Sequence, residues 1–286
     1  MAESLGANRQ LPLYDGDRSP DGAFRLELLD YDPVQPVATS VDRPWLFAYD
    51  PVTTPSKGAV LILGGGGYLQ LMVEKEGAAV AQWLAKLGYH AFVLVHRFPN
   101  ATNGPRAPLD DARQALRVIR REVDPAVTRI GVCGLSSGGH LASALLAEYP
   151  AVWTPSLSPE EAAPVPALDF AIIGYGPIST NAKGRTIIPD KAPLEPPEKQ
   201  ALYDVVQPDV QVAGTPPPTF IVYSANDPIV PVVNAYRLAD GLTTAGGSVE
   251  LHVFANAPHG FALGTENLPV SQWPVMCEAW LKNTFD

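Results

Sequence analysis

Short apolar runs alternate along the chain with amphipathic stretches. Residues 59–63 (AVLIL) and 90–95 (HAFVLV) are nearly continuous apolar runs, which is typical of strands buried on both faces. Between them, residues 77–88 place apolar side chains at helical spacing, and Gly88 closes this predicted helix. The order strand, helix, strand predicts right-handed crossovers and a mainly parallel sheet.

The same alternation continues to the end of the chain. Further strands are predicted at 128–134, 168–175, 219–226 and 248–254, and further helices at 109–123, 136–149, 232–246 and 271–283. Alternating segments near residues 24 and 44 have no helix between them, so the sheet should open with antiparallel pairs. We therefore expect a single α/β domain over residues 1–286, with a central sheet of about eight strands flanked by helices. Residues 176–217 are proline-rich and weakly periodic, and we interpret them as a loop-rich insertion near the functional site.

Composition narrows the classes of function. The 286 residues are 46% hydrophobic and 17% charged, as in globular proteins. A net charge of −10 argues against nucleic-acid binding and disfavours strongly anionic substrates. No apolar run reaches bilayer length, so no membrane partner is expected. The oligomeric state stays open, and a homo-oligomer is compatible with the sequence.

The N-terminal segment bears on localisation. Residues 1–22 are polar and carry no apolar core of a secretory signal, which predicts a cytoplasmic protein. A secreted form whose signal had been removed would show the same pattern.

The strongest local motif is Gly134-Leu135-Ser136-Ser137-Gly138, between a predicted strand and a predicted helix. A serine hydroxyl is a poor nucleophile, so it must be held exposed beside a base. A tight strand-to-helix turn flanked by small residues achieves this. The alternative is a glycine-rich helix start or an anion site at a helix N-terminus. Ser136 has glycine at both −2 and +2, so it is the predicted nucleophile.

Four consecutive glycines, residues 64–67, follow the buried strand 59–63. Acyl transfer builds negative charge on a carbonyl oxygen, and backbone N–H groups of a tight glycine loop can be aimed at it. A flexible loop or a phosphate cradle is the alternative, but the spacing of a dinucleotide site is absent. The backbone N–H groups expected to bind the oxyanion are those of Gly65, Gly66 and Ser137.

Two further candidates follow later strands. Asp227 comes after the strand 219–226, and His259 after the strand 248–254. Alone, the aspartate would be interpreted as a turn residue and the histidine as a surface residue. The chain order Ser, Asp, His is that of α/β-hydrolases, and each candidate lies just past a strand, where ligand sites of such sheets collect. We expect His259 to take the Ser136 proton and Asp227 to orient the imidazole.

The remaining polar residues are given structural roles. Arg97 is predicted to pair with Asp111, His140 to be packed inside its helix and Cys133 to be a small buried residue. No cluster of His, Cys or carboxylate residues has metal-ligand spacing. No metal and no organic cofactor is therefore expected.

Three segments resemble a known group of enzymes: GGGGYLQLMVEKEGAAVAQWLAKLGYHAFVLVHRFP, GLSSGGHLAS, and the stretch from TPPPTFIVYSANDPIV to NAPHGFAL. They are similar to the oxyanion, nucleophile and Asp–His segments of acetylxylan-esterase-like and feruloyl-esterase-like proteins, which are related to hormone-sensitive-lipase-type esterases. Gly64, Ser137 and His96 depart from the residues usual in that family. The resemblance implies an α/β-hydrolase fold and a serine carboxylic ester hydrolase.

The expected activity is hydrolysis of short-chain carboxylic esters through an acyl-enzyme. The resemblance implies acetyl or other acyl groups on carbohydrates as substrates, alongside small-molecule esters. Tyr68 and Leu71, just beyond the glycines, are expected to line the substrate pocket. One alternative is an amidase or formamidase with the same triad, and another is a non-catalytic binding protein of the same fold.

Overall fold

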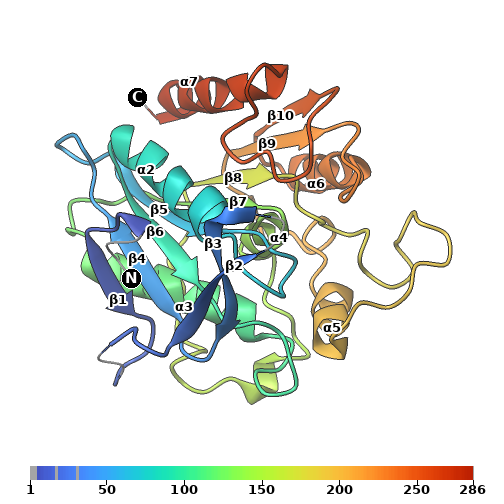
Figure 1. The fold of residues 1–286 in the computed structure, drawn as a ribbon, viewed down its shortest axis with the longest axis horizontal. Helices are drawn as coiled ribbons and strands as arrows, with labels where there is room; N and C mark the ends of the chain where they lie inside the picture. Colours follow the sequence, from blue (N-terminus) through green and yellow to red (C-terminus); the bar gives the residue numbers. More distant parts are fainter. Residues whose placement is uncertain (1–4, 17–18, 30–31, 286) are drawn as a thin grey trace.

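A sheet of eight strands forms the centre of the molecule (Figure 1). The computed structural model describes residues 5–16, 19–29 and 32–285. The strands run in the order β1-β4-β6-β5-β7-β8-β9-β10. Their bounds are β1 Arg9–Pro12, β4 Trp45–Tyr49, β5 Gly58–Leu63, β6 Tyr89–Val95, β7 Ile130–Leu135, β8 Phe170–Gly174, β9 Thr219–Ser224 and β10 Val249–Phe254.

The pairing confirms the predicted sheet. From β6 to β10 in this order, each strand is parallel to the next, whereas β4 runs antiparallel to both β1 and β6. Strands β5 and β7, at the middle, are buried over their whole length, which explains their continuous apolar sequence. The mainly parallel sheet of about eight strands is therefore confirmed, but its antiparallel opening is made by β1 and β4, and the predicted strand near residue 24 lies outside this sheet.

Helices cover both faces of the sheet (Figure 1). On one face α2 and α7 meet through the rings of Trp83 and Trp273, whose centroids are 5.5 Å apart. On the other face α3 and α4 pack beside each other, and α6 lies against β9 and β10. Their bounds are α2 Ala79–Lys86, α3 Ala107–Glu122, α4 Ser137–Ala144, α5 Pro197–Val205, α6 Val233–Thr244 and α7 Trp273–Phe285, with short turns at Glu74–Ala78 (η1, a π-helix), Thr154–Ser156 (η2) and Pro269–Gln272 (η3).

Some elements differ from the sequence prediction. Strand β3 (Asp32–Val41) carries two prolines, and it pairs only with β2 (Phe24–Leu29) in a separate antiparallel ribbon. Helix α4 ends at Ala144, although the apolar pattern continues to residue 149. Helix α5 lies inside the segment 176–217, where no helix was expected, and it begins with proline at its first position, where the missing N–H costs nothing. None of the helices within the described ranges has the length and apolar character needed to cross a bilayer.

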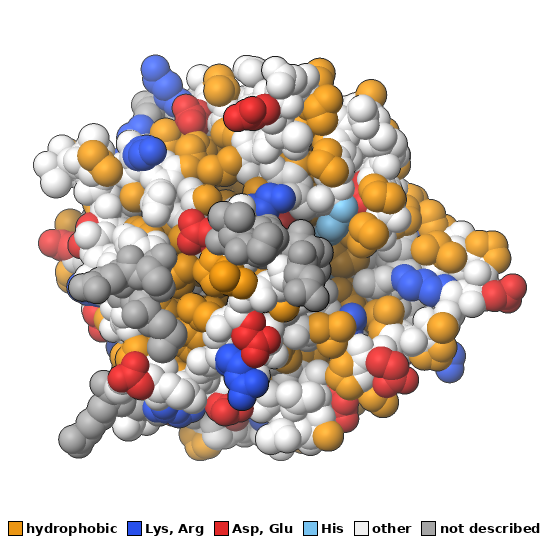
Figure 2. Space-filling model, viewed as in Figure 1, with side chains coloured by type: hydrophobic (Ala, Val, Ile, Leu, Met, Phe, Trp, Pro, Cys, Tyr) orange, Lys and Arg blue, Asp and Glu red, His pale blue; other side chains and the backbone are white. Residues whose placement is uncertain are grey.

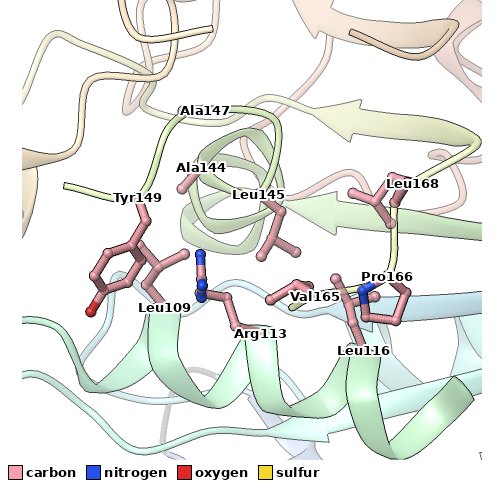
Figure 3. Close-up of a pocket in the computed structure, with 11 residues that line it drawn as sticks. Leu109, Arg113, Leu116, Ala144, Leu145, Ala147, Tyr149, Val165, Pro166 and Leu168 are labelled. Carbon is pink, nitrogen blue, oxygen red and sulfur yellow. The ribbon is translucent and has the colours of Figure 1, made fainter. Parts of the chain in front are cut away.

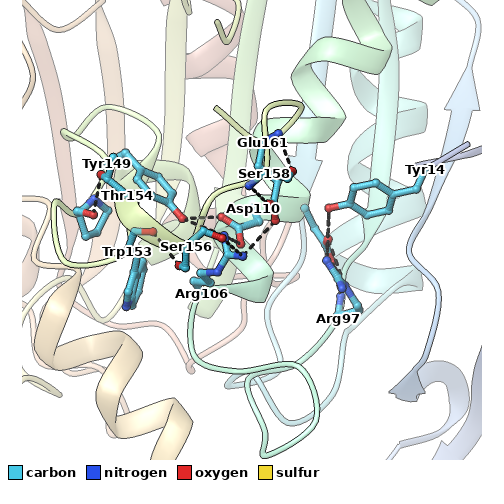
Figure 4. Close-up of polar contacts among 12 residues, drawn as sticks. Tyr14, Arg97, Arg106, Asp110, Tyr149, Trp153, Thr154, Ser156, Ser158 and Glu161 are labelled. Carbon is cyan, nitrogen blue, oxygen red and sulfur yellow. Dashed lines mark hydrogen bonds and ion pairs between the residues drawn. The ribbon is translucent and has the colours of Figure 1, made fainter. Parts of the chain in front are cut away.

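A buried ion pair joins three distant segments. The predicted pair of Arg97 and Asp111 forms, with Arg97 Nη2 2.6 Å from Asp111 Oδ1. The backbone N–H of Arg97 also donates to this carboxylate, as does the Tyr14 hydroxyl at 2.9 Å (Figure 4). The Asp111 side chain is fully buried. These bonds tie the N-terminal segment and the loop after β6 to helix α3.

Replacing Asp111 with alanine should destabilise the fold. Removing one partner of a buried ion pair leaves the other charge uncompensated, so the free energy of unfolding should fall by about 3 kcal/mol or more. Urea denaturation followed by tryptophan fluorescence measures this. The exposed pair Arg25–Glu27, 3.6 Å apart, is the control. Glu27→Ala should cost less than about 1 kcal/mol. Equal losses in the two variants would contradict the anchoring role of Asp111.

Candidate active site

Four loops meet at the carboxyl edge of the sheet. The glycine loop (residues 64–67) follows β5, Ser136 follows β7, Asp227 lies in the loop after β9, and His259 lies in the loop after β10. Parallel strands end at the same edge, so residues far apart in sequence come together there. The predicted site residues therefore lie together at the carboxyl edge of the sheet.

The turn at Ser136 is sharp. Its backbone angles, φ of 54° and ψ of −125°, lie in a region that residues other than glycine rarely adopt. The flanking glycines make the turn sterically feasible: a Cβ on Gly134 would collide with the carbonyl oxygen of Gly138, and one on Gly138 with that of Leu63. The G-x-S-x-G pattern is thus a packing requirement of the crossing between β7 and α4.

Ser136, His259 and Asp227 form one line of hydrogen bonds. Ser136 Oγ lies 2.9 Å from His259 Nε2, and His259 Nδ1 lies 2.7 Å from Asp227 Oδ2. Because Nδ1–H donates to the carboxylate, Nε2 is free to accept the serine proton. This geometry suits a serine whose proton is taken as it attacks.

Asp227 is held from its other side as well. Its second oxygen, Oδ1, accepts the backbone N–H groups of Ile229 and Val230, each at 2.8 Å. The Asp227 side chain is fully buried, whereas that of His259 is 19% exposed. The two backbone N–H groups therefore fix the carboxylate independently of the imidazole, and the imidazole is accessible to solvent.

The glycine loop corrects one predicted donor. The N–H of Gly65 donates to Glu76 Oε2 at 2.7 Å, so it is not available to a substrate oxygen. Gly67 N–H donates to Ser137 Oγ at 2.9 Å. Among the hydrogen bonds of the described residues, none is made by the N–H of Gly66 or of Ser137. Of the three predicted oxyanion donors, the N–H groups of Gly66 and Ser137 therefore stay candidates, whereas that of Gly65 does not.

The hydroxyl of Ser137 has a contact that the sequence did not reveal. Only a backbone role was predicted for Ser137, yet its Oγ accepts the Gly67 N–H and so ties the glycine loop to the start of α4. The one available signal was the departure from the alanine usual at this position.

A cavity of about 470 Å³ opens beside Ser136 and His259. Its other lining residues come from the glycine loop, from the segment that follows it and from the loops that carry Asp227 and His259: Gly66, Gly67, Gln70, Met72, Lys75, Glu76, Ile229 and Gly260. Figure 2 shows a hollow in the molecular surface with a histidine side chain in its wall. The cavity is thus lined by both polar and apolar side chains.

Tyr68 and Leu71 were expected in this lining, and that expectation is wrong. Both are only 1% exposed. Leu71 exchanges backbone hydrogen bonds with Ala38, which turns its side chain into the core. Tyr68 has a φ of 62°, and its ring packs inward. Gln70 and Met72, which alternate with Leu71, line the cavity instead.

Tyr68 makes a buried hydrogen bond behind the loop. Its hydroxyl lies 2.8 Å from His140 Nδ1, and His140 Nε2 lies 3.0 Å from the carbonyl oxygen of Val206. Since the carbonyl can only accept, Nε2 carries the proton and Nδ1 accepts from the tyrosine. Burial lowers the pKa of His140 to about 4, so this ring is neutral near pH 7. His140 is packed, as predicted.

The segment 176–217 packs against the glycine loop and Tyr68. The ring of Tyr203 on α5 lies 5.6 Å from that of Tyr68, and a Cβ added to Gly67 would lie 3.9 Å from Lys199 Nζ. None of the residues that line the cavity comes from this segment. Its contact with the site is therefore through the back of the glycine loop.

A second cavity, of about 190 Å³, lies between α3, the end of α4 and residues 165–168 (Figure 3). Its walls are largely aliphatic, and the Arg113 guanidinium lies 4.4 Å above the Tyr149 ring. No serine, histidine or carboxylate lines it. The cavity beside Ser136, in contrast, is lined by a serine, a histidine and a glutamate.

Several known proteins resemble this chain. An acetylxylan esterase of Xylanibacter ruminicola is 31% identical over 224 residues, which are 74% of this chain and 42% of that protein. The crystal structure of an acetyl ester-xyloside bifunctional hydrolase from Caldicellulosiruptor lactoaceticus is 26% identical, with a TM-score of 0.69 over 97% of this chain and 96% of that one. A carboxylesterase from Lactobacillus plantarum shares the fold, at 20% identity and a TM-score of 0.68 over 91% and 97%.

These similarities confirm the expected resemblance to acetylxylan-esterase-like proteins and the α/β-hydrolase fold. Carboxylic ester hydrolysis, the expected class of activity, is named in these relatives. The family model described as BD-FAE matches residues 48–242, which run from the end of β4 through α6 and include the glycine loop, Ser136 and Asp227. A match over most of the chain shows that this protein belongs to the BD-FAE family.

Proposed function

We propose that this chain hydrolyses short-chain carboxylic esters through a covalent acyl-enzyme on Ser136. The observation that carries the proposal is the line from Ser136 through His259 to Asp227 at an open cavity. A serine becomes a useful nucleophile when a neighbouring base takes its proton during attack. Asp227 would then stabilise the imidazolium that forms.

In the first half of the reaction, Ser136 Oγ bonds to the ester carbonyl carbon while its proton passes to His259 Nε2. The carbonyl oxygen becomes negatively charged and faces the N–H groups of Gly66 and Ser137, which need no reorganisation to meet it. The intermediate then collapses, the bond to the alcohol oxygen breaks, and the alcohol leaves with the proton from His259.

In the second half, water attacks the acyl-enzyme. His259 takes one proton from the water as its oxygen bonds to the acyl carbon. When the bond to Ser136 Oγ breaks, the serine recovers that proton and the carboxylic acid is released. Each half uses the same base and the same oxyanion donors, so one site serves both.

Acylated carbohydrates are the proposed substrates. The name of one relative specifies acetylxylan, and that of a structural neighbour specifies an acetyl ester and a xyloside. The chain spans 42% of the acetylxylan esterase, so the activity of that whole protein reaches this chain only as a proposal. Gln70 and Lys75 in the cavity wall provide hydrogen-bond donors that suit a sugar hydroxyl.

The cavity favours a small acyl group. Each buried methylene contributes about 0.8 kcal/mol, but only where an apolar wall receives it. Met72 and Ile229 are the large apolar side chains in the lining, and Ile229 is 66% exposed. A long acyl chain would therefore leave most of its methylenes in water.

Ser136→Ala should lower kcat by roughly four to six orders of magnitude, because the triad residues act as a unit. Hydrolysis of p-nitrophenyl acetate measures this, and mass spectrometry should find a fluorophosphonate probe on Ser136. The distant Ser156→Ala is the control and should retain full activity. An active Ser136→Ala variant would refute the mechanism. Faster turnover of N-formylkynurenine than of p-nitrophenyl acetate would indicate a formamidase instead.

Ser137→Ala should weaken catalysis without abolishing it. The substitution removes the acceptor of the Gly67 N–H and loosens the glycine loop. We expect kcat to fall about five- to tenfold, the order of one neutral hydrogen bond. Labelling of Ser136 by the fluorophosphonate should persist, which distinguishes this variant from Ser136→Ala. Wild-type kcat would show that the hydroxyl does not support the loop.

Acyl-chain length should strongly affect the rate. We expect kcat/KM to be highest from acetyl to butyryl esters and to fall for longer chains, because the lining offers little apolar wall. Measuring p-nitrophenyl esters from acetate to palmitate decides this. A maximum at eight carbons or longer would overturn the preference for short chains.

A further inference from the structure

Glu76 is a buried carboxylate beside the proposed nucleophile. It is 3% exposed, and it lies in the π-helical turn η1, between the glycine loop and α2. Such turns are rare and often occur at functional sites. Its Oε2 accepts the Gly65 N–H at 2.7 Å, and it belongs to the wall of the same cavity as Ser136. An ionised carboxylate in this position needs strong hydrogen bonds to offset its burial.

The other carboxylate oxygen reaches the segment beyond His259. The Tyr175 hydroxyl donates to Glu76 Oε1 at 2.9 Å, and it accepts the backbone N–H of Ala262 at 3.0 Å. The Tyr175 ring also meets the His259 imidazole at 5.3 Å between centroids. One line of hydrogen bonds therefore runs from the glycine loop through Glu76 and Tyr175 to the segment beyond His259.

The ionisation of Glu76 depends on its neighbours. Burial raises the pKa of Glu76 above its usual value, and the hydrogen bonds from Tyr175 and Gly65 and the charges of a protonated His259 and of Lys75 offset only part of this rise. The titratable groups that interact with it are Lys75, Cys133, Tyr175 and His259. Burial raises the pKa of Cys133 and of Tyr175, so both are neutral near pH 7. Two donors on its two oxygens match an ionised carboxylate.

We propose that Glu76 is a positioning residue of the hydrolytic site. By holding Gly65, its carboxylate directs the next N–H, that of Gly66, toward the substrate oxygen. Its negative charge also stabilises the His259 imidazolium, which forms in both halves of the reaction. Glu76 gains and loses no proton during turnover. The proposal rests on the proposed role of Ser136 and adds a second carboxylate that acts on the same imidazole as Asp227.

Glu76→Gln tests the proposal because it removes the charge and keeps the shape. We expect kcat to fall about 10- to 100-fold, with KM changed less than threefold. Without the negative charge the imidazolium is less stable, so the acid limb of kcat/KM should move to lower pH. One unit charge several ångströms away accounts for a shift of roughly 0.5 pH unit. Glu74→Gln, the same change two residues away, should leave kcat and the limb unmoved.

The outcomes separate this proposal from the proposed function. If wild type hydrolyses p-nitrophenyl acetate and carries the fluorophosphonate on Ser136 while Glu76→Gln matches it in kcat and pH profile, Glu76 has no positioning role. A lower kcat with an unmoved acid limb would leave Glu76 only a packing role and would also overturn the proposal. An unlabelled wild type would instead reject the function of Ser136.

If Glu76→Gln does not fold, as judged by circular dichroism, the variant Tyr175→Phe tests the proposal instead. It removes the hydroxyl between Glu76 and Ala262 and leaves the carboxylate in place. We expect kcat to fall about five- to tenfold, the order of one lost hydrogen bond. Wild-type kcat in this variant would show that the line through Tyr175 does not affect the chemistry, and the proposal would fail.

Discussion

The reversal of the chain at Ser136 is the constraint on which the rest of this site depends. Ser136, with φ of 54° between a buried strand and a helix, fits here because the residues two before and two after it, Gly134 and Gly138, have no side chains to collide. The absence of these side chains lets β5, β7 and α4 approach so closely that the glycine loop lies beside the serine. Ser137 Oγ then accepts a hydrogen bond from the loop itself, so the proposed nucleophile and the proposed oxyanion donors are positioned by the same backbone packing.

Two buried carboxylates approach the imidazole of His259 from different elements. Asp227 accepts from Nδ1–H and is fixed by two backbone N–H groups, whereas Glu76 is held by Gly65 and by Tyr175, whose ring contacts the imidazole. Neither carboxylate is left without donors, as the cost of a buried charge requires. Like the buried carboxylate of Asp111, these two differ from carboxylates on the surface, which are solvated and need no such support.

The sequence predicted the sheet and most helices, because strands buried on both faces and amphipathic helices leave strong periodic signals. It also placed Ser136, Asp227 and His259 at strand ends, where the structure brings them together. It could not fix the register of the glycine loop, since four identical residues carry no positional signal, and Gly65 turned out to donate to Glu76. The sequence did not single out Glu76, because its contacts with Gly65 and Tyr175 come from segments distant in the chain. Tyr68 was misplaced because a positive φ reverses the direction expected of its side chain. Tertiary contacts decided each of these cases.

The hydrogen bond between Tyr68 and His140 links proton uptake to folding. The native ring accepts from Tyr68 and donates to Val206, which requires its neutral form. Its pKa is lowered by burial from 6.5 to about 4, so between these values the unfolded chain binds a proton that the native chain does not. This contribution to stability is complete above pH 6.5 and is lost as the pH falls toward 4, by an amount on the order of 3 kcal/mol. The buried hydrogen bonds of His140, which lie behind the glycine loop, therefore make the native state less stable at acidic pH.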